Sequence, residues 1–483
     1  MSKAGRVFRN TSYMLLARIT TVVIGVATSV LTARYLGANG LGVLGFALAF
    51  TAILSVIVDF GLGTLATREV SRNQTLTGKY LANVVTMRLC LAGAYIVLIA
   101  LLVNVMGYPQ QTVLVTYVIA ISVVISTLAG TVSAMFQAFQ ELQYVAIASL
   151  LTSIMLLVSI AAAIALHVSV IGFAFVYIIA NAITLVYLCI AYSRRFKWEG
   201  PWVDWAFWRA ALKEAWPMAA LAISVMVYFR IDVVILSIFR GAAEIGFYTV
   251  AYTVSETTTI IPTMFMASLF PLISQIHENS RHSFADTCAK SMKYMFFLGL
   301  PMAFTVTLWA TPAITFFYGS AFGGSAVALQ IIIWAAAAMY VGIILGSTFI
   351  SANLQKLSMK LTIGAVVFNI TLNMLVIPRY GYLGASTTTV ATEAFLVCLG
   401  IVFLERTGYP LKAGRMAWPS FFGLAVISAM AVALLRYGAH LVLITGIALA
   451  TYAIIIYKLG LDQEDKQLVA NLMRRARSKR SET

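Results

Sequence analysis

Cysteine and histidine are scarce in this chain, with four of each among 483 residues. The cysteines, Cys90, Cys189, Cys288 and Cys398, show no paired spacing, so the sequence predicts neither a disulfide framework nor a cysteine metal site. The histidines stand apart from one another, so no histidine metal cluster is predicted either. The G-x-x-x-x-G-K-[ST] phosphate loop is also lacking, which argues against ATP hydrolysis. We therefore expect no metal and no cofactor.

Charged residues are scarce as well, at 10% of the chain, whereas 61% of the residues are hydrophobic. These proportions exclude a soluble multidomain protein. The apolar residues form stretches near the length of about 20 residues that a helix needs to cross a bilayer, and a helix satisfies its own backbone in lipid. The sequence therefore predicts an all-α polytopic membrane protein. Its fourteen expected spans are residues 12–34, 41–66, 81–106, 112–136, 144–167, 169–192, 213–238, 244–272, 291–317, 327–350, 358–377, 382–404, 416–436 and 438–458.

Basic residues gather in every second connection. With the N-terminus in the cytoplasm, 26 of the 33 lysine and arginine side chains lie on the cytoplasmic side, so the positive-inside rule places both termini there. The net charge of +16 thus follows from topology and does not indicate a nucleic-acid partner. We expect the tail to contact anionic membrane lipids, with docking of a cytoplasmic partner as the alternative. Its basic residues are Arg474, Arg475, Arg477, Lys479 and Arg480.

The chain contains a weak internal repeat. Arg34-Tyr35-Leu36-Gly37 is followed by a glycine and aromatic segment at 42–46, and Phe239-Arg240-Gly241 is followed by Gly246-Phe247-Tyr248. Such similarity is typical of transporter halves, and six spans per half make the repeat parallel, with the cargo between two lobes. We predict six-span lobes at 1–192 and 213–404, an interfacial linker at 193–212, appended spans at 405–458 and a basic tail at 459–483. The linker carries Trp198, Trp202, Trp205 and Trp208.

Arginine at span depth is the first signal of function, because a charge at a helix centre costs about 2.5–3.5 kcal/mol on insertion scales. Arg18 lies inside the first span and Arg88 inside the third at comparable depth. The alternative for either side chain is snorkelling to the cytoplasmic headgroups. The face of Arg18 is polar and small, which suits a water-filled cavity or close helix packing. That face carries Thr21, Gly25, Thr28, Ser29 and Thr32.

Span seven contains Arg230 and Asp232, which point about 200° apart on a helix and cannot face the same cavity. Asp232 shares a face with Tyr228, which favours a structural hydrogen-bonding role for this carboxylate. Arg230 is then the cavity candidate of this span.

Two carboxylates lie deeper in the predicted spans. Glu256 stands in the middle of span eight on a threonine-lined face, and Glu393 stands in the middle of span twelve. Desolvation favours the protonated form of a buried carboxyl, so either is a candidate for ion coupling; the alternative is a hydrogen-bonded residue that joins helices. Asp59, at the end of span two, is expected to cap or tie helices.

Several short motifs in a fixed order resemble the polysaccharide-transporter family of Wzx-type oligosaccharide flippases, within the superfamily that includes multidrug exporters and lipid II flippases. They are Leu36-Gly37 with 42–46, Asp59-Phe60-Gly61-Leu62-Gly63, Arg68-Glu69, and Asp232 with Gly246-Phe247-Tyr248 and Ala251. The resemblance covers essentially the whole chain. It implies a protein that moves an undecaprenyl-pyrophosphate-linked oligosaccharide across a bacterial plasma membrane by alternating access and that is not an enzyme. Because a nucleotide site is lacking, directional flipping would need a gradient of H⁺ or Na⁺ or a downstream sink for the glycan.

The resemblance also implies partners and binding residues. A polysaccharide polymerase or glycosyltransferase is the expected protein partner. Arg18 and Arg34 match the placement of basic residues that receive the pyrophosphate in similar flippases, although Arg34 also stands where a side chain would face headgroups. The appended spans resemble a pair that borders a groove for the lipid tail. Sugars would contact hydroxyls, amides and aromatic faces such as Thr21, Thr28, Asn181, Tyr228, Asn369 and Asn373.

The sign of the charge separates the two candidate cargoes. A cation exporter of the same fold needs an acidic cavity, whereas the first lobe supplies Arg18 and Arg88 against Asp59 alone. This balance favours an anionic cargo, since guanidinium groups match pyrophosphate oxygens. A multidrug or ion antiporter is the second hypothesis, and a passive scramblase would transport without an ion gradient.

Overall fold

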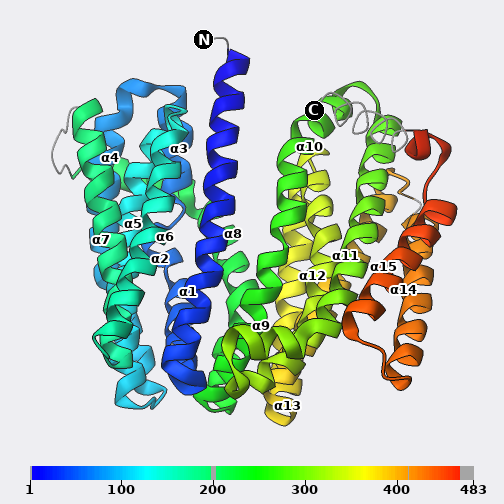
Figure 1. Ribbon diagram of the computed structural model, residues 1–483. Coiled ribbons are helices and arrows are strands. Elements are labelled where there is room, and N and C mark those ends of the chain that lie inside the picture. Colours follow the sequence, from blue (N-terminus) through cyan, green and yellow to red (C-terminus); the bar gives the residue numbers. More distant parts are fainter. Residues whose placement is uncertain (1–2, 197–202, 412, 468–483) are drawn as a thin grey trace, which may run out of the picture. The chain divides into compact units, whose positions relative to one another are not determined.

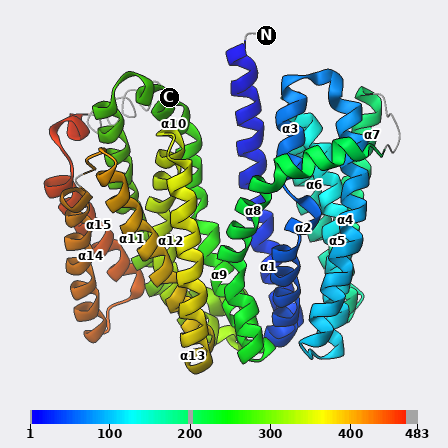
Figure 2. The same cartoon turned by 180° about the vertical axis from the view of Figure 1, so that it is seen from behind.

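The computed structural model describes residues 3–196, 203–411 and 413–467, and these residues form helices joined by short connections (Figures 1 and 2). The all-α prediction is confirmed. The α-helices are α1 (Lys3–Leu54), α2 (Val56–Asp59), α3 (Leu62–Arg72), α4 (Thr77–Val105), α5 (Gln110–Ala138), α6 (Leu142–Ala165), α7 (Val170–Arg195), α8 (Trp205–Phe239), α9 (Ala242–Thr258), α10 (Ile260–Asn279), α11 (Arg281–Tyr318), α12 (Gly323–Ser351), α13 (Gln355–Arg406), α14 (Ala413–Arg436) and α15 (Leu441–Ile455). Short 3₁₀ turns cover Gln74–Leu76 and Ser320–Phe322, and a π turn covers Ile456–Gly460.

Twelve helical segments among the described residues are long and apolar enough to cross a membrane, where the sequence predicted fourteen. The difference lies in α1 and α13, which each contain two predicted spans. Both are interrupted by a glycine with positive φ, 64° at Gly37 and 57° at Gly381. These backbone conformations are almost confined to glycine. The described residues therefore contain twelve to fourteen candidate spans, according to whether the two interrupted helices are counted once or twice.

Span two ends earlier than the predicted residue 66. Phe60 and Gly61 are successive residues with positive φ, 44° and 72°, and they stop the helix after Asp59. The chain then continues as α3, whose buried face carries Leu62, Leu65 and Val70. Apolar residues on one side of this amphipathic helix extended the hydrophobic stretch in the sequence and made the span seem longer.

Span eight is divided, whereas the sequence predicted one kinked helix over 244–272. The break lies at Thr259, between α9 and α10. Pro262 has no N–H to donate to the carbonyl of Thr258, four residues earlier. The hydroxyl of Tyr340 donates to that carbonyl instead, at 2.9 Å. A side chain from another helix therefore stabilises the break that the proline causes.

The chain forms two compact units, and their boundaries fall within helices. The first unit contains the described residues as far as Thr257, with 314–328 and 362–388. The second contains 258–313, 329–361 and the described residues from Thr389 onward. This division follows spatial contacts, so the predicted six-span lobes at 1–192 and 213–404 stay a prediction based on the sequence repeat.

The first unit has two apolar cores. One gathers α3, α4, α5, α7 and the start of α8 around Phe136 and Tyr192, and the other gathers α1, α5, α6 and α7 around Phe173. In Figure 2 the beginning of α8 crosses next to α3. Burial of large aromatic side chains on both sides of α5 and α7 makes this helix group a rigid support for the polar residues described below.

The predicted interfacial linker is in part the first turn of α8. Asp204 caps this helix by accepting the N–H of Phe207 at 3.0 Å. Trp205 is 73% exposed, but Trp208 is only 9% exposed and donates its indole N–H to Asn83. The interfacial position of the linker stays a prediction. Trp198 and Trp202 lie outside the described residues, as does the basic tail from 468 onward.

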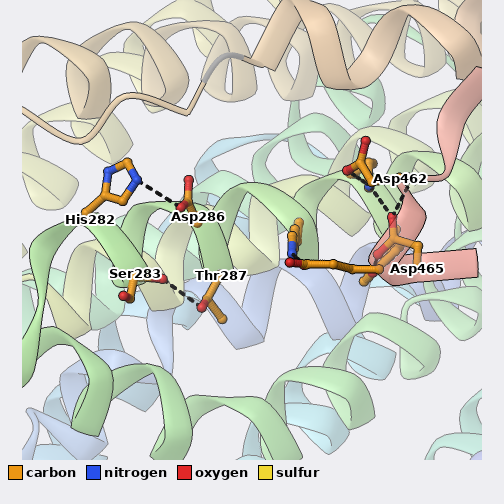
Figure 3. Close-up of polar contacts among 10 residues, drawn as sticks. His282, Ser283, Asp286, Thr287, Asp462 and Asp465 are labelled. Atoms are coloured by element: carbon orange, nitrogen blue, oxygen red, sulfur yellow. Dashed lines mark hydrogen bonds and ion pairs between the residues drawn. The ribbon is translucent and has the colours of Figure 1, made fainter. Parts of the chain in front are cut away.

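In the second unit, a buried ion pair docks the segment after α15 against α11. Lys293 Nζ lies 2.6 Å from Asp465 Oδ2, and the two side chains are 4% and 6% exposed. The hydroxyl of Tyr294 donates to the other oxygen of Asp465 at 2.6 Å. Figure 3 shows Asp465 with Asp462, whose Oδ2 lies 3.1 Å from Lys293 Nζ. The same view includes the exposed contacts of α11, His282 with Asp286 and Ser283 with Thr287.

We expect Asp465→Asn to lower the midpoint of thermal unfolding in detergent, because it leaves a buried lysine short of a counter-charge, at a cost of about 3 kcal/mol. Burial raises the pKa of Asp465, but the hydrogen bonds from Lys293 and Tyr294 outweigh this and hold the pKa below its usual range. The stabilisation is therefore complete at neutral pH and declines as the pH falls below about 4. Glu464→Gln is the control, because Glu464 is exposed and its pair with Lys290 contributes about 1 kcal/mol or less. Equal effects of the two variants would contradict this account.

Candidate functional site

The two glycine-rich turns that the sequence identifies as repeats lie directly against each other in the first unit. A Cβ atom on Gly42 would lie 1.7 Å from the carbonyl oxygen of Ala242, and one on Gly246 would lie 2.1 Å from the carbonyl oxygen of Ala38. Gly246 lies 204 residues after Gly42, and Ala242 lies 204 residues after Ala38. Each contact is therefore the repeat equivalent of the other. Such reciprocity is what a two-fold relation between repeats produces. Only glycine permits this approach of backbone to backbone.

The same relation holds one helical turn further along. Gly45 and Thr249 are also 204 residues apart, and a Cβ on Gly45 would lie 2.7 Å from Oγ1 of Thr249. A residue that contacts its own repeat equivalent lies close to the axis that relates the repeats. The local axis of pseudosymmetry therefore passes between α1 and α9.

Two arginines at the ends of the repeated helices hold neighbouring carbonyl groups. Arg34 donates to the carbonyls of Phe316 and Phe317, both at 2.6 Å, at the end of α11. Arg240 donates to the carbonyls of Pro378 and Arg379 at 2.9 and 3.0 Å. Carbonyls near the end or break of a helix lack intrahelical donors and carry partial negative charge, which explains the attraction. The guanidinium of Arg34, a predicted pyrophosphate ligand, is thus engaged with backbone.

Below the turns, the polar faces of α1 and α9 meet. A cavity of about 160 Å³ is lined by part of each face together with residues of α6 and α7. Ser29, on its edge, exchanges a hydrogen bond with the hydroxyl of Tyr318 at 3.2 Å. The sequence identified each polar face separately, and the structure brings them together. The polar and small residues that line the cavity are Gly25, Thr28, Ser29, Thr32, Gly45, Thr249 and Thr253.

Two residues with different predicted roles form one charged group. Arg230 lies on α8 and Glu256 on α9, with 4.0 Å between guanidinium nitrogen and carboxylate oxygen. The guanidinium carbon also lies 5.6 Å from the ring centroid of Tyr252. Because Glu256 is 57% exposed and Arg230 36% exposed, the pair is accessible. The carboxylate of Glu256 therefore balances the charge of Arg230. The sequence did not indicate that these two residues are neighbours.

Asp232 faces the opposite side of α8 and is buried. Its two oxygens accept the hydroxyl of Tyr248 and the N–H of Val233. Tyr228, one turn earlier, stands edge to face against Phe229 at 5.1 Å. Asp232 thereby joins α8 to α9, and the structural role expected for it stays a prediction.

Arg88 and Asp59 form an ion pair beside a second, larger cavity in the first unit. The side chain of Arg88 is 1% exposed and also donates to the carbonyl of Thr127 at 2.7 Å and to the hydroxyl of Thr131. Asp59 additionally accepts the N–H of Gly61 at 3.1 Å, so it ties the turn after α2 to α4. The cavity of about 670 Å³ extends from this pair along α3 and α5.

The remaining predicted residues do not line either cavity. Arg18 is exposed on α1, and Glu393 is buried on the part of α13 that belongs to the second unit. Asn369 and Asn373 are buried on the other part of α13, with a hydrogen bond of 2.9 Å from the amide of Asn373 to the carbonyl oxygen of Asn369. Asn181, predicted to contact sugars, donates to Ser122 at 2.8 Å and joins α7 to α5.

Sequence reasoning missed the residues that complete these sites. Tyr318 carried no distinguishing pattern among 22 tyrosines. Thr64 and Gln137 line the larger cavity although they lie at the ends of different helices. Thr64 gave no signal in the sequence, because the turn at Phe60 and Gly61 that directs α3 across the cavity is not visible in local hydropathy.

Residues 7–277, more than half of the chain, match the family model described as "Polysaccharide biosynthesis protein". The chain belongs to this family. Residues 217–375 also match the MatE family model. The predicted resemblance is confirmed, and the chain is a multi-pass membrane protein.

One curated relative and two solved structures illustrate the similarity. The chain is 25% identical over 179 residues to the "Probable low-salt glycan biosynthesis flippase Agl15" of Haloferax volcanii, and the match spans 37% of this chain and 38% of that relative. The fold is similar to that of the lipid II flippase MurJ in an inward closed conformation, with a TM-score of 0.74 at 14% identity over 92% of this chain and 98% of that one. It is also similar to an inward-facing multidrug resistance MATE family transporter of the MOP superfamily, with a TM-score of 0.66 at 16% identity over 81% and 95% of the two chains.

Proposed function

We propose that this protein is a flippase that moves an undecaprenyl-pyrophosphate-linked oligosaccharide from the inner to the outer leaflet of a bacterial plasma membrane by alternating access. Family membership and the similarity to a probable glycan biosynthesis flippase support the cargo class. The observation that carries the mechanism is the reciprocal contact of Gly42 with Ala242 and of Gly246 with Ala38. A contact between matched turns of two repeats is a natural closing point for two lobes that rock about their common axis.

The chemistry of this closing point suits a reversible gate. The central contacts join backbone to backbone without side chains, and the hydrogen bonds from Arg34 to the carbonyls of Phe316 and Phe317 join the two predicted lobes. Each such bond is worth about 0.5–1.5 kcal/mol, or somewhat more for a charged donor, so the set can open without a large barrier. By the predicted topology these turns lie outside, so their closure directs cargo entry to the inner leaflet.

Directional transport needs an energy source, and we propose an ion gradient. Glu256 is the first candidate because it is accessible and lies beside Arg230 on the two helices that flank the repeat axis. Protonation of Glu256 would remove the counter-charge of Arg230 and free its guanidinium for the pyrophosphate. Glu393 is the second candidate.

The direct test is transport by purified protein in vesicles. Wild type should move a fluorescent undecaprenyl-pyrophosphate oligosaccharide to the opposite leaflet, where an impermeant quencher reports its arrival. Organic cations should neither compete nor be transported. Transport of organic cations without transport of the lipid-linked glycan would instead establish the multidrug antiporter, and glycan transport unaffected by any ion gradient would establish a scramblase.

Arg18 provides a residue-level test of the cargo's charge. This arginine is exposed on α1, and its helix carries the cavity face below the gate. We expect Arg18→Ala to slow flipping on the order of tenfold, equivalent to about 1.4 kcal/mol, and Arg18→Lys to retain part of the rate because it keeps the charge but loses the bidentate geometry. Normal flipping by Arg18→Ala at wild-type expression would reduce Arg18 to a snorkelling role.

A further inference from the structure

The cavity beside the Arg88–Asp59 pair has the size and lining of a ligand site. Its volume of about 670 Å³ lies within the range of about 300–1,000 Å³ that is typical of small-molecule sites. Its lining residues belong to α2, α3, α4, α5 and the turn that precedes α2, so the cavity lies inside one helix group of the first unit. It is therefore a separate feature from the gate between α1 and α9.

The charges that line the cavity are already matched. Arg88 is paired with Asp59, and Arg68 is paired with Glu69 at 2.8 Å and with Glu214. A pyrophosphate needs guanidinium donors that are not already occupied by carboxylates. The carboxylate of Asp59, at 40% exposure on the cavity side of the pair, would also repel a phosphate oxygen. This balance disfavours an anionic ligand.

The uncharged lining suits a polyhydroxylated ligand. Thr64 and Gln137 are exposed in the cavity, and among the described residues their side chains have no hydrogen-bond partner. The hydroxyls of Ser55, Ser71 and Thr127 donate to backbone carbonyls three or four residues earlier in the chain, which leaves their lone pairs as acceptors. Sugar hydroxyls both donate and accept, so a surface of hydroxyl, amide and carboxylate oxygens satisfies them.

Two glycines keep this space open. A Cβ on Gly63 would lie 3.0 Å from a guanidinium nitrogen of Arg88 and 3.3 Å from a carboxylate oxygen of Asp59, so glycine leaves the ion pair uncovered. A Cβ on Gly130 would meet no atom within 4 Å, and Gly130 lines the cavity. A larger side chain at Gly130 would therefore enter the cavity without disturbing the helices.

From these observations we infer that the cavity is a glycan subsite, which holds sugars of the cargo inside the first helix group while the pyrophosphate binds elsewhere. This inference rests on the proposed flippase function. The cavity-lining ends of α3 and α5 face the cytoplasm in the predicted topology, which is the side where cargo would be loaded. The subsite would give the protein preference for cargoes with longer head groups.

The test compares Gly130→Leu with Gly93→Leu in vesicles. Gly93 is an exposed glycine inside α4 where a Cβ would likewise meet no atom within 4 Å, and it does not line the cavity. Two probes are used, undecaprenyl pyrophosphate with a single sugar and the same carrier with a complete oligosaccharide. We expect Gly130→Leu to slow flipping of the longer probe on the order of tenfold and to leave the single-sugar probe unchanged, while Gly93→Leu affects neither.

Other outcomes separate the two proposals. If Gly130→Leu transports both probes as wild type does, or slows both by the same factor, the glycan subsite is wrong while the flippase function stands. Failure of wild type to move either probe would refute the flippase function itself. Thr64→Val with Gln137→Leu is a second variant of the subsite, because it removes hydrogen-bonding groups without filling the cavity. It should also impair only the longer probe.

Discussion

Gly42→Leu should abolish transport of the lipid-linked oligosaccharide, with a loss of at least about tenfold. Any Cβ at this position would overlap the carbonyl oxygen of Ala242, to which it would lie 1.7 Å away. Backbone atoms on both sides belong to helices, so neither can yield without separating α1 from α9. The closed form of the gate is therefore lost, and the protein should stay open at the turns. Flipping in vesicles gives the rate.

The state of the gate can be read independently of transport. In a variant without the four native cysteines, Ser29→Cys lies in the small cavity below the turns. Adding Gly42→Leu to this variant should raise the rate at which the thiol introduced by Ser29→Cys reacts with an impermeant reagent added from outside. Gly241→Leu is the matched control, because Gly241 lies in the same turn region and a Cβ there would meet no atom within 4 Å. Equal transport by the two leucine variants would show that the glycine contact is not a gate.

Misfolding is a separate explanation for a loss of transport, and Gly246→Ala addresses it. This variant disrupts the equivalent contact in the other repeat, because the added Cβ would lie 2.1 Å from the Ala38 carbonyl oxygen. It introduces only one methyl group. It should also raise labelling of Ser29→Cys, while its elution from a sizing column stays that of wild type. Normal labelling in a folded Gly246→Ala protein would contradict the reciprocal gate.

Glu256→Gln should slow proton-driven flipping on the order of tenfold and flatten its dependence on pH. Glutamine keeps the shape of the side chain but cannot exchange a proton, and it leaves Arg230 without its carboxylate partner at 4.0 Å. If release of Arg230 by protonation is the coupling step, the variant should bind cargo and yet ignore the imposed gradient. Initial rates in vesicles at several internal and external pH values measure this.

Two further variants locate the coupling residue. Glu393→Gln changes the buried carboxylate in the second unit and should leave the response to pH unchanged. Arg230→Ala combined with Glu256→Gln should be no slower than Arg230→Ala alone, because both changes act on one pair. A wild-type response by Glu256→Gln together with a flat response by Glu393→Gln would transfer the coupling role to Glu393.

Much of the architecture was readable in the sequence because lipid imposes few solutions on a backbone. Long apolar stretches in a chain with 10% charged residues have to be helices, and basic connections orient them. The early end of span two and the break in span eight were not readable. They depend on the positive φ of Phe60 and on a hydrogen bond from Tyr340, a residue 82 positions away from Thr258. Local hydropathy contains no information about such contacts.

The candidate site shows the same division. Helical periodicity identified the polar face of α1, the carboxylate of Glu256 and the opposite orientations of Arg230 and Asp232 from the sequence alone, because side-chain direction follows from spacing within one helix. Which faces meet was decided only by tertiary structure. The pairing of Arg230 with Glu256 and of Arg88 with Asp59 joins different helices, and packing of whole helices sets those distances. The two glycines at 42 and 246 were visible as a repeated motif, but their contact requires the repeats to approach backbone to backbone, and that approach exists only in the folded protein.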